Sequence, residues 1–168
     1  MFKFIEVSES NSEDFHRLMQ MYAKGLDEHQ NRCTDEKILA KWTDSIIAKQ
    51  YETGRCLKLC CADDKLIGFL YGKIDQPEDR GFKKVGYGYV MEFYVQPQYR
   101  RNGCGRVMLD HLEGYFRENG AEKMYLTADP VTGKPFWQAV GFVSAGEISP
   151  ENNLPIYEKE VSPLTKSK

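Results

Sequence analysis

The sequence predicts an α/β fold, with about seven strands in a mixed, mostly antiparallel central sheet flanked by about four helices. Short apolar runs bounded by turn residues alternate with longer segments whose apolar residues recur at helical spacing. Two pairs of runs have short polar connections, as antiparallel hairpins do. The 168 residues, of which 41% are hydrophobic and 29% charged, suit a single domain that spans the whole chain, 1–168.

The first third of the chain predicts one strand and two helices. Residues 2–7 suit a short strand, and the polar segment 8–14 then precedes a helix that ends near Glu28. The apolar face of that helix is formed by Phe15, Leu18, Met19, Tyr22 and Leu26. Thr34 is suited to cap a second helix, because two acidic residues follow it, and this helix is expected to end near Gly54.

Three strands follow. The segments 55–62 and 65–74 are joined by two aspartates, which suits an antiparallel hairpin. A long polar loop is expected at 75–88, because this segment contains one proline and several glycines. It leads into an apolar, aromatic strand at 89–95.

The turn at 96–105 and the helix at 106–119 together suit the binding of an anion. They follow the strand at 89–95, and Gly103 and Gly105 lie among three arginines. The first N–H groups of a helix have no partners within it and lie at the positive end of its dipole, so an anion there gains hydrogen bonds and favourable charge. Two glycines alone would equally suit a sharp turn, and the arginines favour an anion.

The remaining elements are shorter. Gly120 is suited to end the helix at 106–119. The chain then predicts a strand at 123–128, a turn followed by a short helix at 134–140, a closing hairpin of strands 142–148 and 154–161, and a frayed tail at 162–168.

Composition excludes several classes of function. The net charge of -2 gives no general attraction to nucleic acid or to anionic lipid. No apolar run approaches a membrane span and no secretory signal is evident, so we expect a cytoplasmic protein. The five cysteines are irregularly spaced and include no CxxC pair. They suit reduced thiols, and we expect Cys33, Cys56, Cys60 and Cys61 to be buried side chains rather than a metal site.

Two known phosphate-binding loops do not match the turn. A P-loop would need Lys and then Ser or Thr after the second glycine, where Arg106 and Val107 stand. A dinucleotide-binding loop would need a third small residue where Met108 stands. The turn therefore belongs to neither type.

The segment YVQPQYRRNGCG, residues 94–105, resembles the acetyl-CoA signature of the GNAT superfamily of N-acetyltransferases, in which two residues separate a Gln or Arg from a following Gly-x-Gly or Gly-x-Ala. Arg100, Gly103 and Gly105 fill these places. The segment ending in Gly141 and Phe142 looks like the second landmark of the family, and the predicted order of elements is also similar. The resemblance implies an acyl-CoA N-acyltransferase fold.

The resemblance also implies a site for acetyl-CoA as co-substrate, without a metal. The backbone of the turn would hold the pyrophosphate, and the preceding strand would bind the pantetheine arm and the thioester. The implied cofactor-binding residues are Phe93, Tyr94, Val95, Arg100, Arg101, Asn102, Gly103, Cys104, Gly105, Arg106 and Trp137. The backbone N–H of Val95 is the candidate for the thioester carbonyl, where it would stabilise an oxyanion.

The catalytic acid and base stay open at this point. Glu92 is either a general base that removes a proton from the amine or a strand-end carboxylate paired with a neighbouring Arg or Lys. Trp137 stands where members of the family often carry a catalytic Tyr, and an indole cannot give up its proton near neutral pH. Trp137 either contacts the CoA sulfur or packs against the sheet. Tyr157 could then supply the proton, or the thiolate leaves unassisted.

We therefore expect an N-acetyltransferase that transfers acetyl directly to a primary amine, of a small molecule first and of a peptide or protein second. The alternative is an acyl-CoA-binding sensor or interaction module with little activity. By resemblance, the acceptor pocket would use the loops around 26–33 and 75–84, whose acidic residues suit a cationic amine or simply solvation: Asp27, Glu28, Glu78 and Asp79. A homodimer through the closing hairpin is a further state that the resemblance allows.

Overall fold

The computed structural model describes residues 1–129 and 133–164, which form two compact units. Unit 1 contains residues 1–71 and 92–108, and unit 2 contains 72–91 and the described residues from 109 onward. The glycine turn at 100–105 belongs to unit 1, and the Gly141–Phe142 segment belongs to unit 2. The single domain over 1–168 stays a prediction. Residues 130–132 of the predicted turn before the short helix, and residues 165–168 of the predicted tail, lie outside the described residues.

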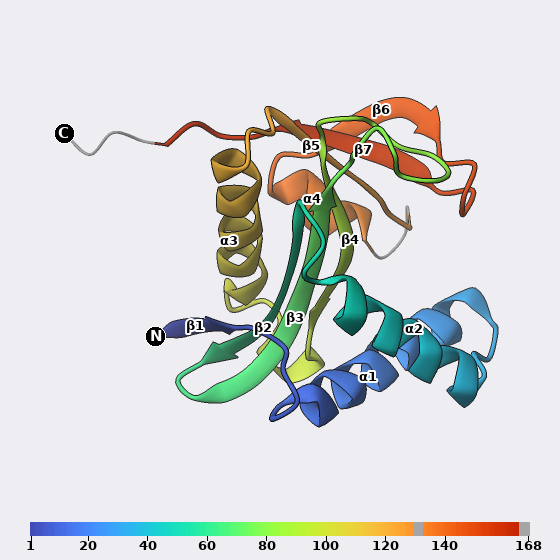
Figure 1. The fold of residues 1–168 in the computed structure, drawn as a ribbon, viewed down its shortest axis with the longest axis vertical. Helices are drawn as coiled ribbons and strands as arrows, with labels where there is room; N and C mark the ends of the chain where they lie inside the picture. The colour runs from blue at the N-terminus through green and yellow to red at the C-terminus, as the bar shows by residue number, and fades with distance from the viewer. Residues whose placement is uncertain (130–132, 165–168) are drawn as a thin grey trace. The chain divides into compact units, whose positions relative to one another are not determined.

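The strands form a sheet of seven in the order β1-β2-β3-β4-β5-β7-β6 (Figure 1). It is mixed, because β4 and β5 are parallel whereas β1 and β2, β5 and β7, and β6 and β7 are antiparallel. The strands are β1 (Phe2–Ile5), β2 (Arg55–Ala62), β3 (Lys65–Ile74), β4 (Gly88–Val95), β5 (Lys123–Thr127), β6 (Val143–Ile148) and β7 (Pro155–Glu160). The helices are α1 (Ser12–Gln30), α2 (Glu36–Lys49), α3 (Cys104–Glu118) and α4 (Lys134–Ala139), with a short 3-10 helix η1 (Pro97–Tyr99). The predicted class is confirmed.

In unit 1, α1 and α2 pack against each other (Figure 1). Their apolar faces contribute to a core whose fully buried members include Phe15, Leu18, Met19, Ile67 and Phe69. The predicted hairpin between β2 and β3 is confirmed: Asp63 and Asp64 both have positive φ, 49° and 62°, as its two-residue turn requires. Among the described residues, no helix has the length and apolarity to cross a membrane.

The predicted cap of the second helix was one residue early. Asp35, not Thr34, is the N-cap of α2, and its carboxylate accepts hydrogen bonds from the N–H groups of Lys37 and Ile38. Thr34 instead donates both its N–H and its hydroxyl to Asp27. The helix also ends at Lys49, five residues before the predicted Gly54. Gly54 has a left-handed φ of 81° and lies in the turn after the helix. Both Thr34 and Asp35 are residues that can cap a helix, and the hydrogen bonds of Thr34 to Asp27 leave Asp35 as the cap.

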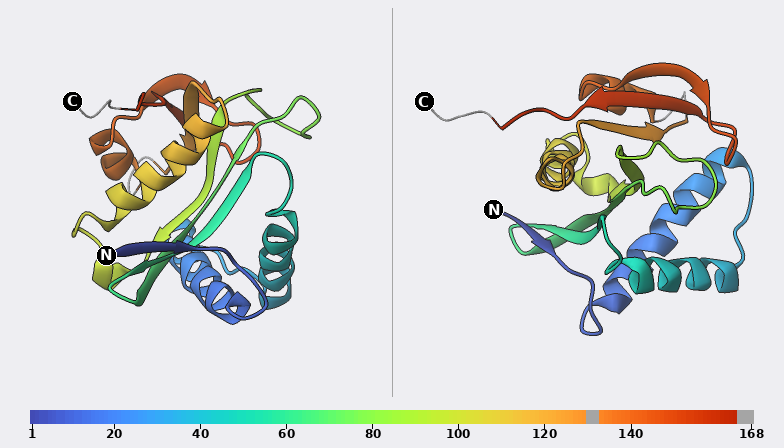
Figure 2. Two further views of the ribbon diagram at one scale, coloured as in Figure 1. Left: turned by 60° about the vertical axis from the view of Figure 1, so that its left-hand side comes forward. Right: turned by 45° about the horizontal axis from the view of Figure 1, so that its top comes forward.

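In unit 2, β6 and β7 form the predicted closing hairpin (Figure 2, orange to red). Gly120 ends α3 as expected, with φ of 86° and its N–H bonded to the carbonyl of Arg117. The loop at 75–88 is anchored at its base, because the Asp75 carboxylate accepts a hydrogen bond from Lys84 N–H at 2.8 Å and another from the Tyr125 hydroxyl.

Candidate functional site

The end of β4 brings Glu92 against α1 within unit 1. The Tyr22 hydroxyl donates a hydrogen bond of 2.5 Å to Oε2 of Glu92, and the Tyr22 ring lies 5.7 Å from that of Tyr94. Glu92 and Tyr94 therefore share the α1 side of the strand, and alternation directs Phe93 and Val95 to the other side. In this unit the observed partner of Glu92 is a tyrosine hydroxyl, whereas an Arg or Lys was the expected structural alternative.

Glu92 is electrostatically unusual. Although the residue as a whole is partly exposed, its carboxyl group is enclosed by protein atoms, and this desolvation raises its pKa to about 7. The hydrogen bond from Tyr22 acts in the opposite direction, because it stabilises the charged form. A carboxyl group with a pKa near neutrality can exchange a proton at physiological pH, as a general base must.

The last residue of β4, Val95, is fixed from two directions. The Nε–H of Arg100 donates a 2.8 Å hydrogen bond to the Val95 carbonyl, and its guanidinium lies 5.5 Å from the centre of the Tyr94 ring. The neighbouring Gln96 donates its N–H to the Ile67 carbonyl on β3 at 2.8 Å. Arg100 therefore has a structural role at the predicted thioester site, besides any contact with a ligand.

Gly68 on β3 allows this part of β4 to approach closely. A Cβ atom at Gly68 would lie 1.9 Å from the Tyr94 carbonyl oxygen and 3.1 Å from the Val95 Cα. A side chain of any size would therefore displace the backbone at Tyr94. Nothing in the local sequence distinguishes Gly68 from other strand glycines, and this constraint was not predicted.

The turn before α3 has the backbone of an anion-binding loop. Arg101 and Gly103 have positive φ, 63° and 80°, and α3 begins directly afterwards at Cys104. Arg101, Gly103 and Arg106 are exposed together with Asn102, whereas Cys104 is buried. Helix-terminal N–H groups and exposed arginines thus occur on one short segment of unit 1.

The two glycines of the turn differ in role. Gly103 needs its left-handed conformation, while Gly105 lies in the first turn of α3, which begins two residues earlier than predicted. The positive φ of Arg101 was not predicted, because such a conformation is uncommon for a side chain of this kind.

Trp137 and Tyr157 belong to unit 2. The indole of Trp137, on α4, packs edge-on against Phe136 at 4.8 Å and Phe142 at 5.5 Å between ring centres. Tyr157 is buried on β7, opposite Leu126 of β5. These contacts support the packing hypothesis for Trp137, and the role of either residue toward CoA stays a prediction.

A cavity of about 590 Å³ lies between α1 and α2 in unit 1, and its rim includes the predicted acceptor loop. Within it, Asp27 accepts hydrogen bonds from Thr34 and pairs with Arg32 at 3.1 Å. The Thr34 hydroxyl and N–H, with Arg32, hold the pKa of Asp27 below its usual value. The Asp27 carboxylate is therefore used in hydrogen bonds and an ion pair within the protein, whereas the Glu28 side chain is exposed.

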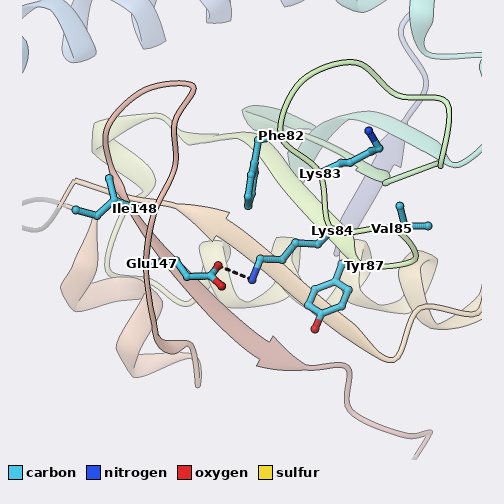
Figure 3. Close-up of a pocket in the computed structure, with 7 residues that line it drawn as sticks. All are labelled: Phe82, Lys83, Lys84, Val85, Tyr87, Glu147 and Ile148. Carbon is cyan, nitrogen blue, oxygen red and sulfur yellow. Dashed lines mark ion pairs between the residues drawn. The ribbon is translucent and has the colours of Figure 1, made fainter.

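A second cavity, of about 480 Å³, is lined in unit 2 by the loop at 82–87 and by Glu147 and Ile148 of β6 (Figure 3). The ammonium of Lys84 lies 2.9 Å from a Glu147 oxygen and also pairs with Glu158. Asp79 binds Lys73 at 3.0 Å. The acidic side chains of this loop region are thus also partly neutralised within the fold.

The cysteines are free thiols. Cys56 and Cys60 are buried as predicted, and burial raises the pKa of Cys56 to about 11. Cys61 is half-buried, and Cys104, which was predicted to bind CoA, is also buried. Cys33 is exposed, which corrects the expectation of burial, because it lies in the loop between α1 and α2. The described residues contain no cluster of three or more His, Cys, Asp or Glu suited to a metal.

Comparison with known proteins gives a consistent result. The model of the Acetyltransferase (GNAT) family matches residues 15–142. No curated protein matches the chain.

Solved structures share the fold at low sequence identity. The PaiA N-acetyltransferase from Thermoplasma acidophilum, in complex with coenzyme A, is 17% identical, with a TM-score of 0.72 over 95% of this chain and 99% of that one. The aminoglycoside N-acetyltransferase AAC(6')-Iy, with a bisubstrate analogue, is 15% identical, with a TM-score of 0.68 over 88% and 95%. The ribosomal-protein-S18-alanine N-acetyltransferase from Escherichia coli is 14% identical, with a TM-score of 0.63 over 100% and 99%.

Proposed function

The chain belongs to the acetyltransferase (GNAT) family and is an acetyl-CoA-dependent N-acetyltransferase, and we propose that it transfers acetyl directly to a primary amine of a small molecule. The observation that carries the proposal is the turn before α3. There the left-handed backbone of Arg101 and Gly103 leads into the first turn of α3, which exposed arginines flank. This arrangement suits the pyrophosphate of CoA. The PaiA protein, which shares the fold, was solved with coenzyme A.

In the proposed reaction, the neutral amine attacks the thioester carbonyl and a C–N bond forms. The Val95 N–H would donate to the developing oxyanion. Glu92 takes one proton from the amine, directly or through water, which its pKa of about 7 suits. The C–S bond then breaks, and the thiolate of CoA takes a proton. We propose Tyr157 as its donor, because the indole of Trp137 cannot supply one.

The choice of a small amine rests on the cavity between α1 and α2. Its volume of about 590 Å³ is in the range of small-molecule sites, and its lining carries acidic side chains, Glu28 and Glu36, beside the basic Lys24 and Arg32. Among proteins of this fold, one named above acts on aminoglycosides and another on a ribosomal protein. Acceptor class is therefore the point that experiment must decide.

The first test measures binding of acetyl-CoA by thermal shift and calorimetry. Acetyl-CoA should raise the melting temperature by mass action. Replacement of both Arg101 and Arg106 by Ala should weaken binding and reduce its dependence on salt. Arg17→Ala removes an exposed arginine from α1 and should leave binding unchanged. Equal affinity in all three proteins would contradict the proposed pyrophosphate site.

The second test measures release of free thiol with polyamines, aminoglycosides, amino acids and peptides. Turnover with a small cationic amine, at a kcat/KM at least tenfold above that for peptides, is the expected result. A preference for peptides would reassign the acceptor. Tight binding of acetyl-CoA without turnover across the panel would count against transfer to a small amine.

A further inference from the structure

Tyr22 and Glu92 are 70 residues apart in the sequence, yet they form a 2.5 Å side-chain hydrogen bond in unit 1. Tyr22 lies in the middle of α1, and Glu92 lies in the second half of β4. The sequence pattern assigns Tyr22 to the apolar stripe of its helix. Its hydroxyl nevertheless reaches the carboxyl group that the proposed reaction uses as base.

Aromatic neighbours hold the Tyr22 ring in place. It packs edge-on against Phe69 at 5.6 Å and lies tilted against Tyr94 at 5.7 Å and Trp42 at 6.4 Å between ring centres. Contacts from three elements therefore limit its rotation, so the hydroxyl has a defined position. A fixed donor in turn fixes the carboxyl group that accepts from it.

We propose that Tyr22 is a positioning residue for acetyl transfer: its hydroxyl orients the Glu92 carboxylate and favours the ionised form that accepts the proton of the amine. This proposal rests on the proposed function, in which Glu92 is the general base. Tyr22 acts through Glu92 and needs no contact with substrate.

Other polar groups near Glu92 belong to β2 and β3 in this unit. The Tyr71 hydroxyl on β3 interacts electrostatically with Glu92 and accepts a 2.5 Å hydrogen bond from Arg55 on β2. Arg55 is paired with Glu52 at 3.0 Å. Burial raises the pKa of Tyr71, which keeps it neutral. The Tyr22 hydroxyl is the donor that bonds directly to the carboxylate.

The sign of the effect follows from these contacts. Burial raises the pKa of Glu92 to about 7, and the bond from Tyr22 opposes this rise. Loss of the bond should therefore raise the pKa further, by about one unit for a hydrogen bond to a charged group. Glu92 would then be ionised only at higher pH, and the ionised fraction at pH 7 would fall about fivefold.

The test uses Tyr22→Phe, which keeps the ring and removes the hydroxyl. Two measurements are made: titration of the Glu92 carboxyl carbon by NMR in protein labelled with ¹³C-Glu, assigned with Glu92→Gln, and the pH dependence of kcat/KM. Trp42→Phe is the matched control, because it keeps an aromatic ring beside Tyr22 and leaves the Tyr22 hydroxyl in place. Tyr71→Phe removes the more distant hydroxyl.

In Tyr22→Phe, both the Glu92 midpoint and the acidic limb of kcat/KM should move to higher pH by about one unit, with acetyl-CoA affinity unchanged. Trp42→Phe should move neither, and Tyr71→Phe should move both by less. An unshifted Glu92 midpoint in Tyr22→Phe overturns the proposal. A failure of the proposed function would give a different result. Glu92→Gln would then keep full turnover, and the acidic limb of its kcat/KM profile would match that of the unmodified protein.

Discussion

Gly68→Ala tests whether the close approach of β3 and β4 shapes the thioester site. The added Cβ would lie 1.9 Å from the Tyr94 carbonyl oxygen, and real Cβ atoms essentially never approach such an atom closer than 3.0 Å. The gap must therefore open from 1.9 to at least 3.0 Å, by about 1.1 Å. The obstructing atom is backbone, so no rotamer change can relieve the contact.

The displaced peptide lies next to Val95, whose N–H is the proposed donor to the thioester carbonyl. A shift of about 1 Å in a reacting group can lower the rate about a hundredfold. Overpacking also costs about 1–3 kcal/mol of stability, which for a chain of this size lowers the melting temperature by roughly 2–4 °C per kcal/mol. We therefore expect kcat to fall far more than the loss of stability alone explains.

The assay compares kcat, the affinity for acetyl-CoA and the melting temperature, with turnover measured well below the melting temperature of the variant. Gly25→Ala is the matched control, because a Cβ at Gly25, within α1, has no atom within 4 Å. It should keep full activity and gain about 0.5–1 kcal/mol from helix propensity. If Gly68→Ala kept kcat within twofold, the reasoning about this contact would be refuted.

Three further predictions concern the turn, the acid and the buried carboxyl group. In Gly103→Val the new Cβ meets no atom within 4 Å, but a β-branched residue is forced to a φ of 80°. Because this conformation is strained, the turn should hold its shape less well, and calorimetry should show acetyl-CoA binding about tenfold more weakly. Tyr157→Phe should lower kcat at least tenfold at alkaline pH, whereas Trp137→Tyr should stay within twofold; a large rise in Trp137→Tyr would show that an acid had been missing. Since the pKa of Glu92 is raised from 4.5 to about 7, its ionisation destabilises the fold above pH 4.5 and fully so above 7. At pH 8 the free energy of unfolding of Glu92→Gln should therefore exceed that of the unmodified protein by at most about 3 kcal/mol, and at pH 4 the two values should be equal. If the two proteins were equally stable at pH 8 as well, Glu92 would not be desolvated.

The sequence predicted the fold class because periodicity and turn chemistry are local. Asp63 and Asp64 adopt the positive φ that a two-residue hairpin needs, and Gly120 ends α3 in the left-handed region. One error lies where a residue outside the local pattern intervenes. Thr34 lost the cap of α2 to Asp35 because Asp27, seven residues earlier, binds both of its donors.

The same distinction applies to the candidate site. The turn from Arg100 to Arg106 could be proposed from the sequence, because its residues are adjacent and their chemistry depends on the start of one helix. Gly68 was not found, because its constraint comes from the Tyr94 carbonyl on another strand. A glycine within a strand has no local signal that separates a packing requirement from simple tolerance.

Glu92 shows why position in a strand is a poor guide to chemistry. Alternation could place the carboxyl group on one side of β4 or the other, but it carried no information about solvent or partners. The hydroxyl of Tyr22, which bonds to it, belongs to a helix stripe that reads as core, and an aromatic residue in such a stripe usually packs without a polar task. Desolvation and this one donor act on the pKa of Glu92 in opposite directions and leave it near 7. Because each contribution comes from a segment distant in sequence, a carboxyl group with this pKa is a property of the folded unit and not of the strand that carries it.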